Sequence, residues 1–171
     1  MSAEEETGKG KTKIAAAFKQ FGFLLFLVFF LMVSSYTGIS DPLLRAIASI
    51  GYKIPTPIQR KAIPVILSGR DIVAMARTGS GKTAAFMIPL IEKLVAHSTT
   101  VGFRAIVISP TRDLALQTLK VGKQLSKYTD LLVASIVGGE NMSDQFDALS
   151  HNPDMFLLFS LIPSTFVCYP F

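Results

Sequence analysis

Two patterns of hydrophobic residues follow one another between residues 38 and 154, and each predicts a type of element. Short continuous apolar runs predict strands: DIVAM at 71–75, RAIVIS at 104–109 and LLVASIV at 131–137. DMFLLFS, from residue 154, begins like a fourth strand. Strands that are apolar throughout, without alternation, are typical of parallel sheets that are buried on both faces.

Amphipathic stretches between these runs predict helices. DPLLRAIASI should end at Gly51, and Thr56 and Pro57 should begin the next helix as its cap and first turn. Three further helices are predicted in KTAAFMIPLIEKLVAH from 82, RDLALQTLKVGKQLSKY from 112 and SDQFDALS from 143. Buried strands joined by helices, with no internal repeat, predict an α/β fold with a doubly wound parallel sheet.

The two ends of the chain have a different character. Residues 1–20 carry three glutamates and then four lysines, which is typical of a charged, disordered arm. Residues 21–37 are apolar and without charge; the run at 21–33 would span about 20 Å as a helix, short of the roughly 30 Å of a bilayer core. A targeting segment or anchor, a buried segment and foreign sequence remain open for this run.

Composition limits the classes of protein to be considered. The 171 residues, half of them hydrophobic, suffice for about one domain. Lysine and arginine exceed the acidic residues by 17 to 12, which favours a polyanionic partner such as nucleic acid. Cys168 is the single cysteine, so a reducing compartment is expected, and the isolated His97 and His151 predict neither catalysis nor a metal site.

The stretch MARTGSGKTAAF, residues 75–86, has the pattern of a phosphate-binding loop. It lies between a predicted strand and a predicted helix, and it fits G-x-x-x-x-G-K-[ST] except that Ala76 replaces the first glycine. Backbone N–H groups of residues 78–82 would bind the β-phosphate, Lys82 would neutralise β and γ oxygens, and Thr83 would ligate Mg²⁺. A plain glycine turn is the alternative, and the Lys-Thr pair argues against it. The predicted loop residues are Ala76, Arg77, Thr78, Gly79, Ser80, Gly81, Lys82 and Thr83.

From Gly38 to Asp154 the chain resembles the N-terminal RecA-like lobe of DEAD-box ATP-dependent RNA helicases. GYKIPTPIQ at 51–59 is similar to the adenine-reading Q motif of that family and ARTGSGKT to its motif I. PTRDLA at 110–115 is similar to motif Ia, and a glycine doublet follows at 138–139. VAMARTGSGKTAAF and NPD further resemble the nucleolar branch, which acts on precursors of the large ribosomal subunit. The resemblance implies ATP, Mg²⁺ and RNA as ligands and a nuclear, nucleolar location.

The resemblance also assigns roles to individual residues. It implies that Gln59 reads adenine, as a carboxamide that donates and accepts can do, and that Tyr52 packs nearby. The alternative for Gln59 is a surface position on a helix. RNA phosphates would be held sequence-independently at the carboxyl ends of strands. The residues implied there are Pro110, Thr111, Arg112, Gly138 and Gly139. The alternative for Arg112 is a surface charge at the start of a helix without a role in binding. Lys120, Lys123 and Lys127 are expected to form a solvated helix face.

The chain also departs from the family pattern. Asp113 replaces a glutamate of motif Ia, and Ser34 stands where the family has an aromatic residue that stacks on adenine. Residues 155–171 do not match the family, and the sequence contains no Asp-Glu pair, so the acidic motif is missing. We therefore expect a partial lobe, residues 38–154, that binds nucleotide and does not hydrolyse it. We also hypothesise that 21–37 and 155–171 are translated non-coding sequence.

Three interpretations of function follow. The ordered motifs favour a fragment of an ATP-dependent RNA helicase that acts in ribosomal RNA processing and lacks the DEAD motif and the second lobe. The missing acidic motif would suit a non-catalytic module that binds ATP and RNA. The third interpretation is a membrane-anchored P-loop protein on a membrane or secretory route, and only the run at 21–33 supports it. We therefore expect no membrane partner. The sequence identifies no protein partner.

Overall fold

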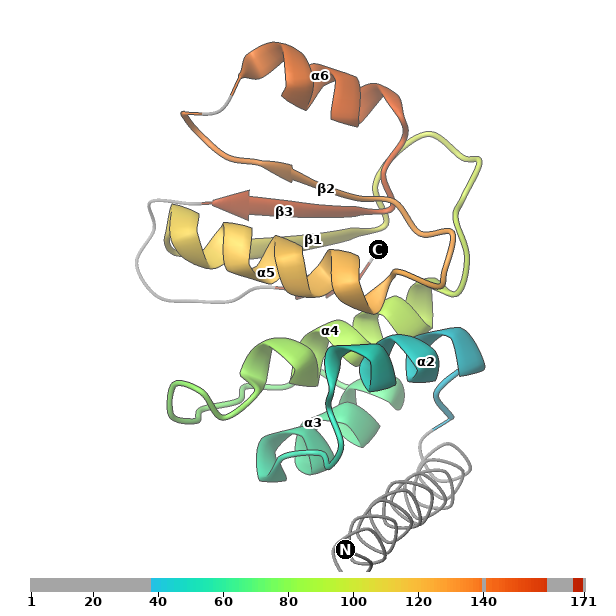
Figure 1. Ribbon diagram of the computed structural model, residues 1–171, viewed down its shortest axis with the longest axis vertical. Coiled ribbons are helices and arrows are strands. Elements are labelled where there is room, and N and C mark those ends of the chain that lie inside the picture. The colour runs from blue at the N-terminus through green and yellow to red at the C-terminus, as the bar shows by residue number, and fades with distance from the viewer. Residues whose placement is uncertain (1–37, 140, 160–167, 171) are drawn as a thin grey trace, which may run out of the picture. The chain divides into compact units, whose positions relative to one another are not determined.

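A four-stranded sheet lies at the centre of the computed structural model, which describes residues 38–139, 141–159 and 168–170. The strands lie in the order β2-β3-β1-β4, and Figure 1 shows β2, β3 and β1 side by side. β1 and β2 each pair with β3 in parallel, whereas β4 pairs with β1 antiparallel. The strands are β1 (Ala105–Ser109), β2 (Val133–Ile136), β3 (Met155–Phe159) and β4 (Cys168–Pro170).

The strand predicted at 71–75 does not form, and this prediction is wrong. β1 is bonded to β3 along one edge and to β4 along the other, from Ala105 opposite Pro170 to Val107 opposite Cys168. Both sides of β1 are therefore occupied, and residues 71–75 pair with neither outer edge of the described sheet, although a strand needs a neighbour for its backbone hydrogen bonds. The segment is exposed instead, with Val73 at 94% and Met75 at 91%. Of the roughly four parallel strands expected, three are present among the described residues.

The predicted helices form, and the boundaries predicted at Gly51 and Thr56 lie where expected, whereas the helices predicted from 82 and from 112 end earlier than expected, at Leu94 and Leu125. Gly51 ends α2 in the left-handed region, with φ of 87°. Thr56 begins α3 with a capping box that is completed by Gln59, and the Thr111 side chain caps α5. The helices are α2 (Asp41–Ile50), α3 (Pro57–Leu67), α4 (Lys82–Leu94), α5 (Arg112–Leu125) and α6 (Met142–Ser150).

One helix, α5, joins the sheet to α2 and α4. It contacts all three parallel strands and also α4 and α2, and α3 packs on α4 (Figure 1). Gly122 makes the close contact possible, because a Cβ there would lie 2.8 Å from Cε of Met87. Val107 of β1 and Met155 and Leu157 of β3 are fully buried in the core. This packing fixes the carboxyl ends of β1 and β2, where the next segments of chain begin.

The chain divides into two compact units, Met1–Gly38 and Ile39–Phe171. The predictions for residues 1–20 and 21–37 lie outside the described residues, as do most of those for the tail. In the part that is described, no helix has the length and apolar character that a bilayer crossing requires.

Candidate nucleotide and RNA sites

The predicted phosphate loop forms a tight turn directly before α4. Gly79 and Gly81 adopt φ angles of 76° and 84°, which glycine tolerates and other residues avoid. The N–H groups of Thr78, Gly79 and Gly81 make no hydrogen bond to any described residue. The Ser80 hydroxyl oxygen is buried and likewise lacks a partner among those residues. These unpaired donors lie at the start of a 13-residue helix. Such a place favours the binding of an anion, because the N–H groups can donate to it and the helix dipole is positive at this end.

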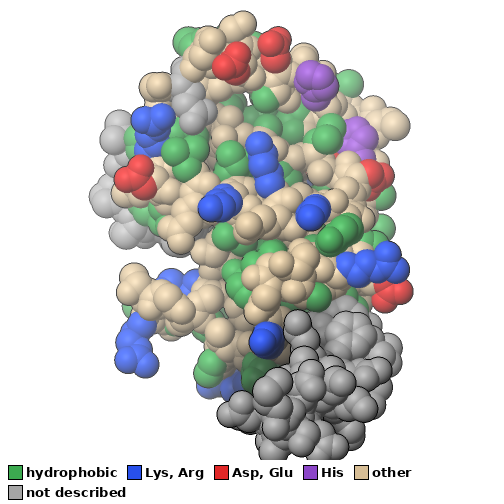
Figure 2. All heavy atoms as spheres, viewed as in Figure 1, with side chains coloured by type: hydrophobic (Ala, Val, Ile, Leu, Met, Phe, Trp, Pro, Cys, Tyr) green, Lys and Arg blue, Asp and Glu red, His purple; other side chains and the backbone are tan. Residues whose placement is uncertain are grey.

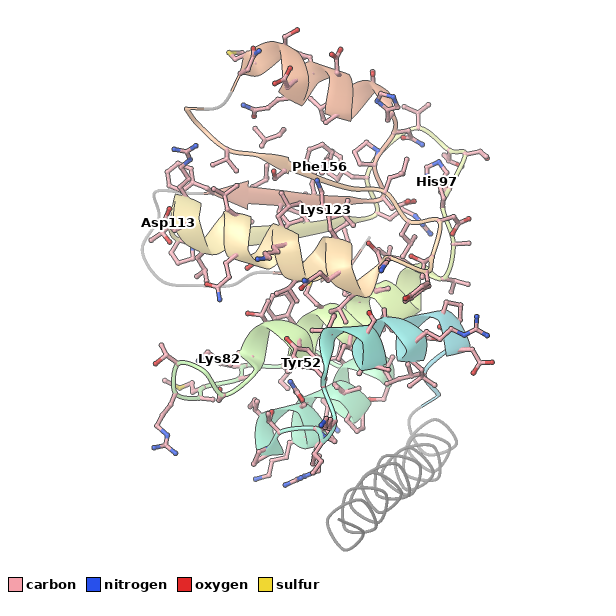
Figure 3. All side chains as sticks on the ribbon, viewed as in Figure 1. Tyr52, Lys82, His97, Asp113, Lys123 and Phe156 are labelled. Atoms are coloured by element: carbon pink, nitrogen blue, oxygen red, sulfur yellow. The ribbon has the colours of Figure 1, made fainter. Side chains whose placement is uncertain are left out.

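Lys82 folds back across this loop. Its ammonium group donates hydrogen bonds to the backbone oxygens of Ala76, at 2.5 Å, and Arg77, at 2.7 Å. The side chain is partly buried and lies at the loop end of α4 (Figure 3). A cation is thus held beside the unpartnered N–H groups, and phosphate oxygens can compete with the two carbonyls for it.

Gln59 connects the start of α3 to the phosphate loop. Its Oε1 accepts a hydrogen bond from the Thr56 N–H at 2.9 Å, and its Nε2 donates one to the Gly81 oxygen at 3.1 Å. The residue is 7% exposed, so the alternative of a surface helix position is wrong. One further lone pair on Oε1 and one further N–H on Nε2 remain, which is the pair of groups that an adenine edge requires. Tyr52, 38% exposed, lies in the segment before α3 (Figure 3).

The residues predicted to hold RNA meet at the carboxyl ends of β1 and β2. Pro110 and Thr111 follow β1 directly, and the Thr111 hydroxyl accepts a hydrogen bond from the Leu114 N–H at 3.3 Å. A Cβ placed on Gly139 would lie 3.6 Å from Nη1 of Arg112, so the guanidinium lies against this backbone. Gly138, after β2, is exposed and has open space around its Cα. The structure therefore brings motif Ia and the glycine doublet together.

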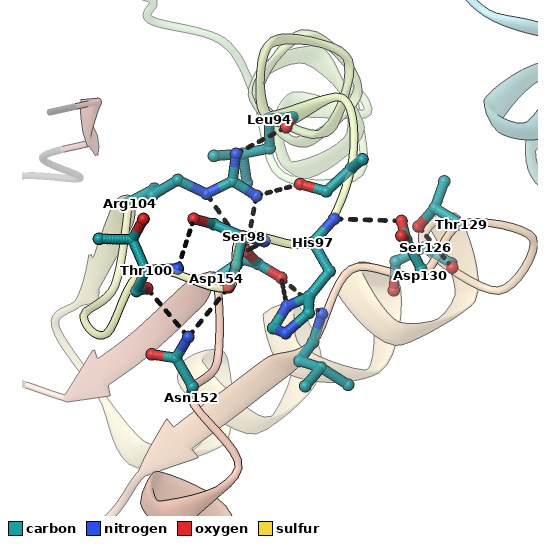
Figure 4. A network of polar contacts seen from close by, with 12 residues as sticks. Leu94, His97, Ser98, Thr100, Arg104, Ser126, Thr129, Asp130, Asn152 and Asp154 are labelled. Carbon is teal, nitrogen blue, oxygen red and sulfur yellow. Dashed lines mark hydrogen bonds and ion pairs between the residues drawn. The ribbon is translucent and has the colours of Figure 1, made fainter.

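A buried carboxylate, Asp154, organises the opposite end of the sheet and was not singled out from the sequence. It is 1% exposed, and its Oδ1 accepts hydrogen bonds from Arg104 Nη2 at 2.6 Å and from the Ser98 N–H at 3.0 Å (Figure 4). Its Oδ2 accepts one from the Leu132 N–H at 3.0 Å and lies 2.8 Å from His97 Nδ1. The long connection between α4 and β1 is thereby fixed to the starts of β1 and β3.

The pKa of Asp154 reflects two opposing effects. Burial raises the pKa, and the hydrogen bonds from His97, from the Leu132 and Ser98 N–H groups and from Arg104 lower it. The hydrogen bonds together have the larger effect, so the pKa lies below its ordinary value. The sequence contained one signal for this network: Arg104 and Asp154 each stand immediately before an apolar strand, where an unpaired charge would be costly. Figure 3 shows His97 on the other side of the molecule from Lys82 and Asp113.

The described residues contain no cluster of three or more His, Cys, Asp or Glu side chains that could hold a metal ion. Thr83, in the first turn of α4 and partly buried, is the predicted Mg²⁺ ligand beside the loop. A hydroxyl at this place suits a hard cation that also binds phosphate oxygens.

Comparison with known proteins identifies the family. Residues 56–160 match the DEAD/DEAH box helicase model, a range that ends within the segment that we set apart as a tail. The chain belongs to the DEAD/DEAH box helicase family. It is 58% identical over 120 residues to the ATP-dependent RNA helicase DDX54 of Mus musculus and, also at 58%, to DBP10 of Chaetomium globosum. These matches cover 70% of this chain and 14% and 16% of those relatives.

Solved helicases share the fold. The Prp28 helicase of Chaetomium thermophilum bound to ADP superposes with a TM-score of 0.68 at 36% identity, over 72% of this chain and 31% of that one. A DEAD box protein of Methanococcus jannaschii gives 0.63 at 42% identity, over 71% and 32%. The prediction of a doubly wound, RecA-like α/β lobe is thereby confirmed, and the chain spans only a small part of the curated helicases that it matches.

Proposed function

We propose that residues 38–154 form part of the ATP-binding lobe of an ATP-dependent RNA helicase. One contact carries this proposal: Gln59, from the predicted adenine-reading motif, donates to the Gly81 oxygen in the phosphate loop at 3.1 Å. The two residues lie 22 positions apart in the sequence, and their hydrogen bond supports one site that is formed by both motifs. Similarity to proteins that are named ATP-dependent RNA helicases supports the same conclusion.

The nucleotide would bind along this line of contacts. Adenine would use the remaining donor and acceptor of Gln59, with Tyr52 nearby, and the β-phosphate would bind the N–H groups of residues 78–82. Lys82 would exchange its bonds to Ala76 and Arg77 for phosphate oxygens. Thr83 would hold Mg²⁺ together with those oxygens.

RNA would bind at the edge where Arg112 lies against Gly139. A guanidinium and exposed backbone at the ends of parallel strands suit phosphate oxygens, which carry no base sequence. Pro110, Thr111 and Gly138 would complete this part of the track. Binding to this chain alone should be weak, steeply dependent on salt and indifferent to sequence.

Hydrolysis requires more than these groups supply. Catalysis of phosphoryl transfer depends on positioned charges: a carboxylate for the metal, a group that orients water and an arginine. Lys82 and Thr83 supply one positive charge and one metal ligand, and the 171-residue sequence has no Asp-Glu pair. We therefore propose that this chain binds ATP and does not hydrolyse it, because hydrolysis would require further charged residues beside Lys82 and Thr83.

We infer a role in ribosomal RNA processing and a nucleolar location from the resemblance of the VAMARTGSGKTAAF and NPD stretches to the nucleolar branch of the family. Immunofluorescence of the tagged chain with a nucleolar marker would test this location. Exclusion of the chain from nucleoli would contradict it.

Competition between nucleotides tests the proposed site. A fluorescent ADP bound to the chain should be displaced by ATP at a concentration about tenfold or more below that of GTP, because a hydrogen-bonding site rejects a base with the wrong edge. Gln59→Glu keeps the acceptor for Thr56 and loses the donor, so it should remove this preference. Equal displacement by ATP and GTP in the unchanged chain would refute adenine recognition by Gln59.

A further inference from the structure

The outer face of α5 carries a row of lysines that the nucleotide site does not use. The buried residues of this helix, Ala115, Thr118, Gly122 and Leu125, define the side that faces the sheet and α4. At about 100° per residue, Lys120 lies opposite that side and Lys123 lies within about 60° of Lys120. Both are exposed, as is Lys127 in the turn that follows the helix.

Basic side chains outnumber acidic ones along α5 and the turn after it, and the next acid, Asp130, accepts a hydrogen bond from the His97 N–H. Residues 112–128 contain four basic side chains and a single acidic one, Asp113. Lys120, Lys123 and Lys127 form no ion pair with any described residue. Figure 2 shows basic side chains over α5 with no acidic side chain between them, and Figure 3 shows Lys123 there. The face is thus complementary to a polyanion.

The row continues from the proposed RNA edge. Arg112 begins α5 beside Gly139, and the helix carries the chain away from that edge toward Lys127. Lys120 lies about 12 Å of helix rise beyond Arg112, and Lys123 lies about 4.5 Å beyond Lys120. A strand held at Arg112 can therefore remain in contact with lysines along α5.

The end of the row is partly fixed in position. The Lys127 ammonium lies 5.3 Å from the centroid of the Tyr128 ring, a cation–π contact. Tyr128 is 45% exposed, so part of this side chain is in contact with solvent at the end of the row. Fixing Lys127 before binding reduces the side-chain entropy that is lost on contact with a phosphate.

We propose that Lys120, Lys123 and Lys127 bind the phosphate backbone of single-stranded RNA, as an extension of the track that starts at Arg112. This inference rests on the proposed function, because it takes RNA as the ligand. It assigns the solvated face of α5 a role beyond the motif residues, and it applies to RNA of any sequence.

The salt dependence of RNA binding tests the proposal. Affinity of the full chain for a labelled oligouridylate is measured between about 50 and 200 mM salt, where each neutralised phosphate contributes roughly −0.7 to the slope for a single strand. The triple variant Lys120→Gln, Lys123→Gln and Lys127→Gln should reduce the steepness of the slope by about 2. The matched control Lys53→Gln, Lys61→Gln and Arg70→Gln removes the same charge from exposed positions in and around α3, and it should leave the slope unchanged.

The outcomes separate this proposal from the proposed function. In one outcome, the unchanged chain binds RNA, Arg112→Ala weakens the binding, and the α5 triple variant keeps the full salt slope. The lysine row is then not an RNA surface, and the proposed function stands. If the unchanged chain binds no RNA at all, both fail. Equal loss of slope in both triple variants would overturn the assignment, as would equally effective competition by polyglutamate, which would point to an acidic protein. Circular dichroism of each variant confirms that it is folded.

Discussion

Gln59 donates a hydrogen bond from its side-chain Nε2 to the backbone oxygen of Gly81 at 3.1 Å, and a Cβ on Gly81 would lie only 2.5 Å from that same nitrogen. The contact therefore requires glycine at 81 and places the side chain at 59 against the phosphate loop. Its second group, Oε1, is held by the Thr56 N–H at 2.9 Å, so the amide is fixed at both ends. The proposed recognition of the base would therefore depend on the shape of the loop.

Gly81→Ala should distort this loop. The variant combines a left-handed φ of 84° with contacts of 2.5 Å to Gln59 and 3.2 Å to Thr56. Gly69→Ala is the matched control, with φ of 81° and open space around it, so it carries only the conformational cost of about 1–2 kcal/mol. Thermal unfolding and nucleotide titration should show a larger loss of stability, and a loss of affinity, in Gly81→Ala alone. Identical behaviour of the two variants would contradict the role of this contact.

Arg112→Ala should weaken RNA binding at every sequence. Removing one phosphate contact should lower the steepness of the salt slope by about 0.7 for a single strand. Arg45→Ala, which removes an exposed arginine of α2, is the control and should have no effect on the slope. Fluorescence anisotropy with uridine-rich and adenine-rich oligonucleotides measures both quantities. An affinity that is unchanged in Arg112→Ala would show that this arginine does not contact RNA.

Asp154→Asn should destabilise the chain and change its response to acid. Breaking a buried ion pair costs about 3 kcal/mol, because Arg104 would lose its charged partner. The pKa of Asp154 is lower in the folded chain than its ordinary value, so its contribution is complete above about pH 4 and is lost as the pH falls through the folded pKa. Urea unfolding at pH 7 and in acid should show the difference between wild type and variant shrinking in acid.

A control for this acid dependence is available on α6. Asp147→Asn changes an exposed aspartate, and it should leave the free energy of unfolding nearly unchanged at both pH values. A variant Asp154→Asn as stable as wild type at pH 7 would mean that the network does not hold the connection between α4 and β1.

Val73→Lys should reduce self-association. Val73 and Met75 are 94% and 91% exposed in a segment that is not paired in the described sheet, and such segments recruit other chains. Light scattering should show large species that depend on concentration in the unchanged chain and fewer of them in Val73→Lys. Val101→Lys is the control, since Val101 is 92% exposed but stands outside the segment. A monodisperse monomer of the unchanged chain would contradict this prediction.

Local signals in the sequence sufficed for the helices and for three strands. Gly51, Thr56 and Thr111 act at the helix ends through bonds to neighbouring residues, so their effect can be predicted from a few positions. The segment 71–75 shows the limit of such signals. It has the composition of a strand, but a strand exists only where a neighbour has a free edge, and β4 occupies that edge of β1.

The site was predictable to a different extent. The glycines and Lys82 of the phosphate loop follow a short pattern, and family resemblance added Gln59, which composition alone would have placed on a surface. The contacts of Arg112 with Gly139, and of Asp154 with Arg104, join residues far apart in the sequence. Only the fold brings such pairs together, although a charge beside an apolar strand already indicates that a partner is needed.

The most direct test of the account is calorimetric titration of ATP with Mg²⁺ into the unchanged chain and into Lys82→Ala, with phosphate release followed in the presence of RNA. We expect saturable binding that is about tenfold or more weaker in Lys82→Ala, because a hydrogen bond to a charged group contributes about 1.5–3 kcal/mol, and we expect no phosphate release above background. Equal affinity of the two chains would contradict the phosphate loop, and turnover that disappears in Lys82→Ala would show that this chain is itself a working ATPase.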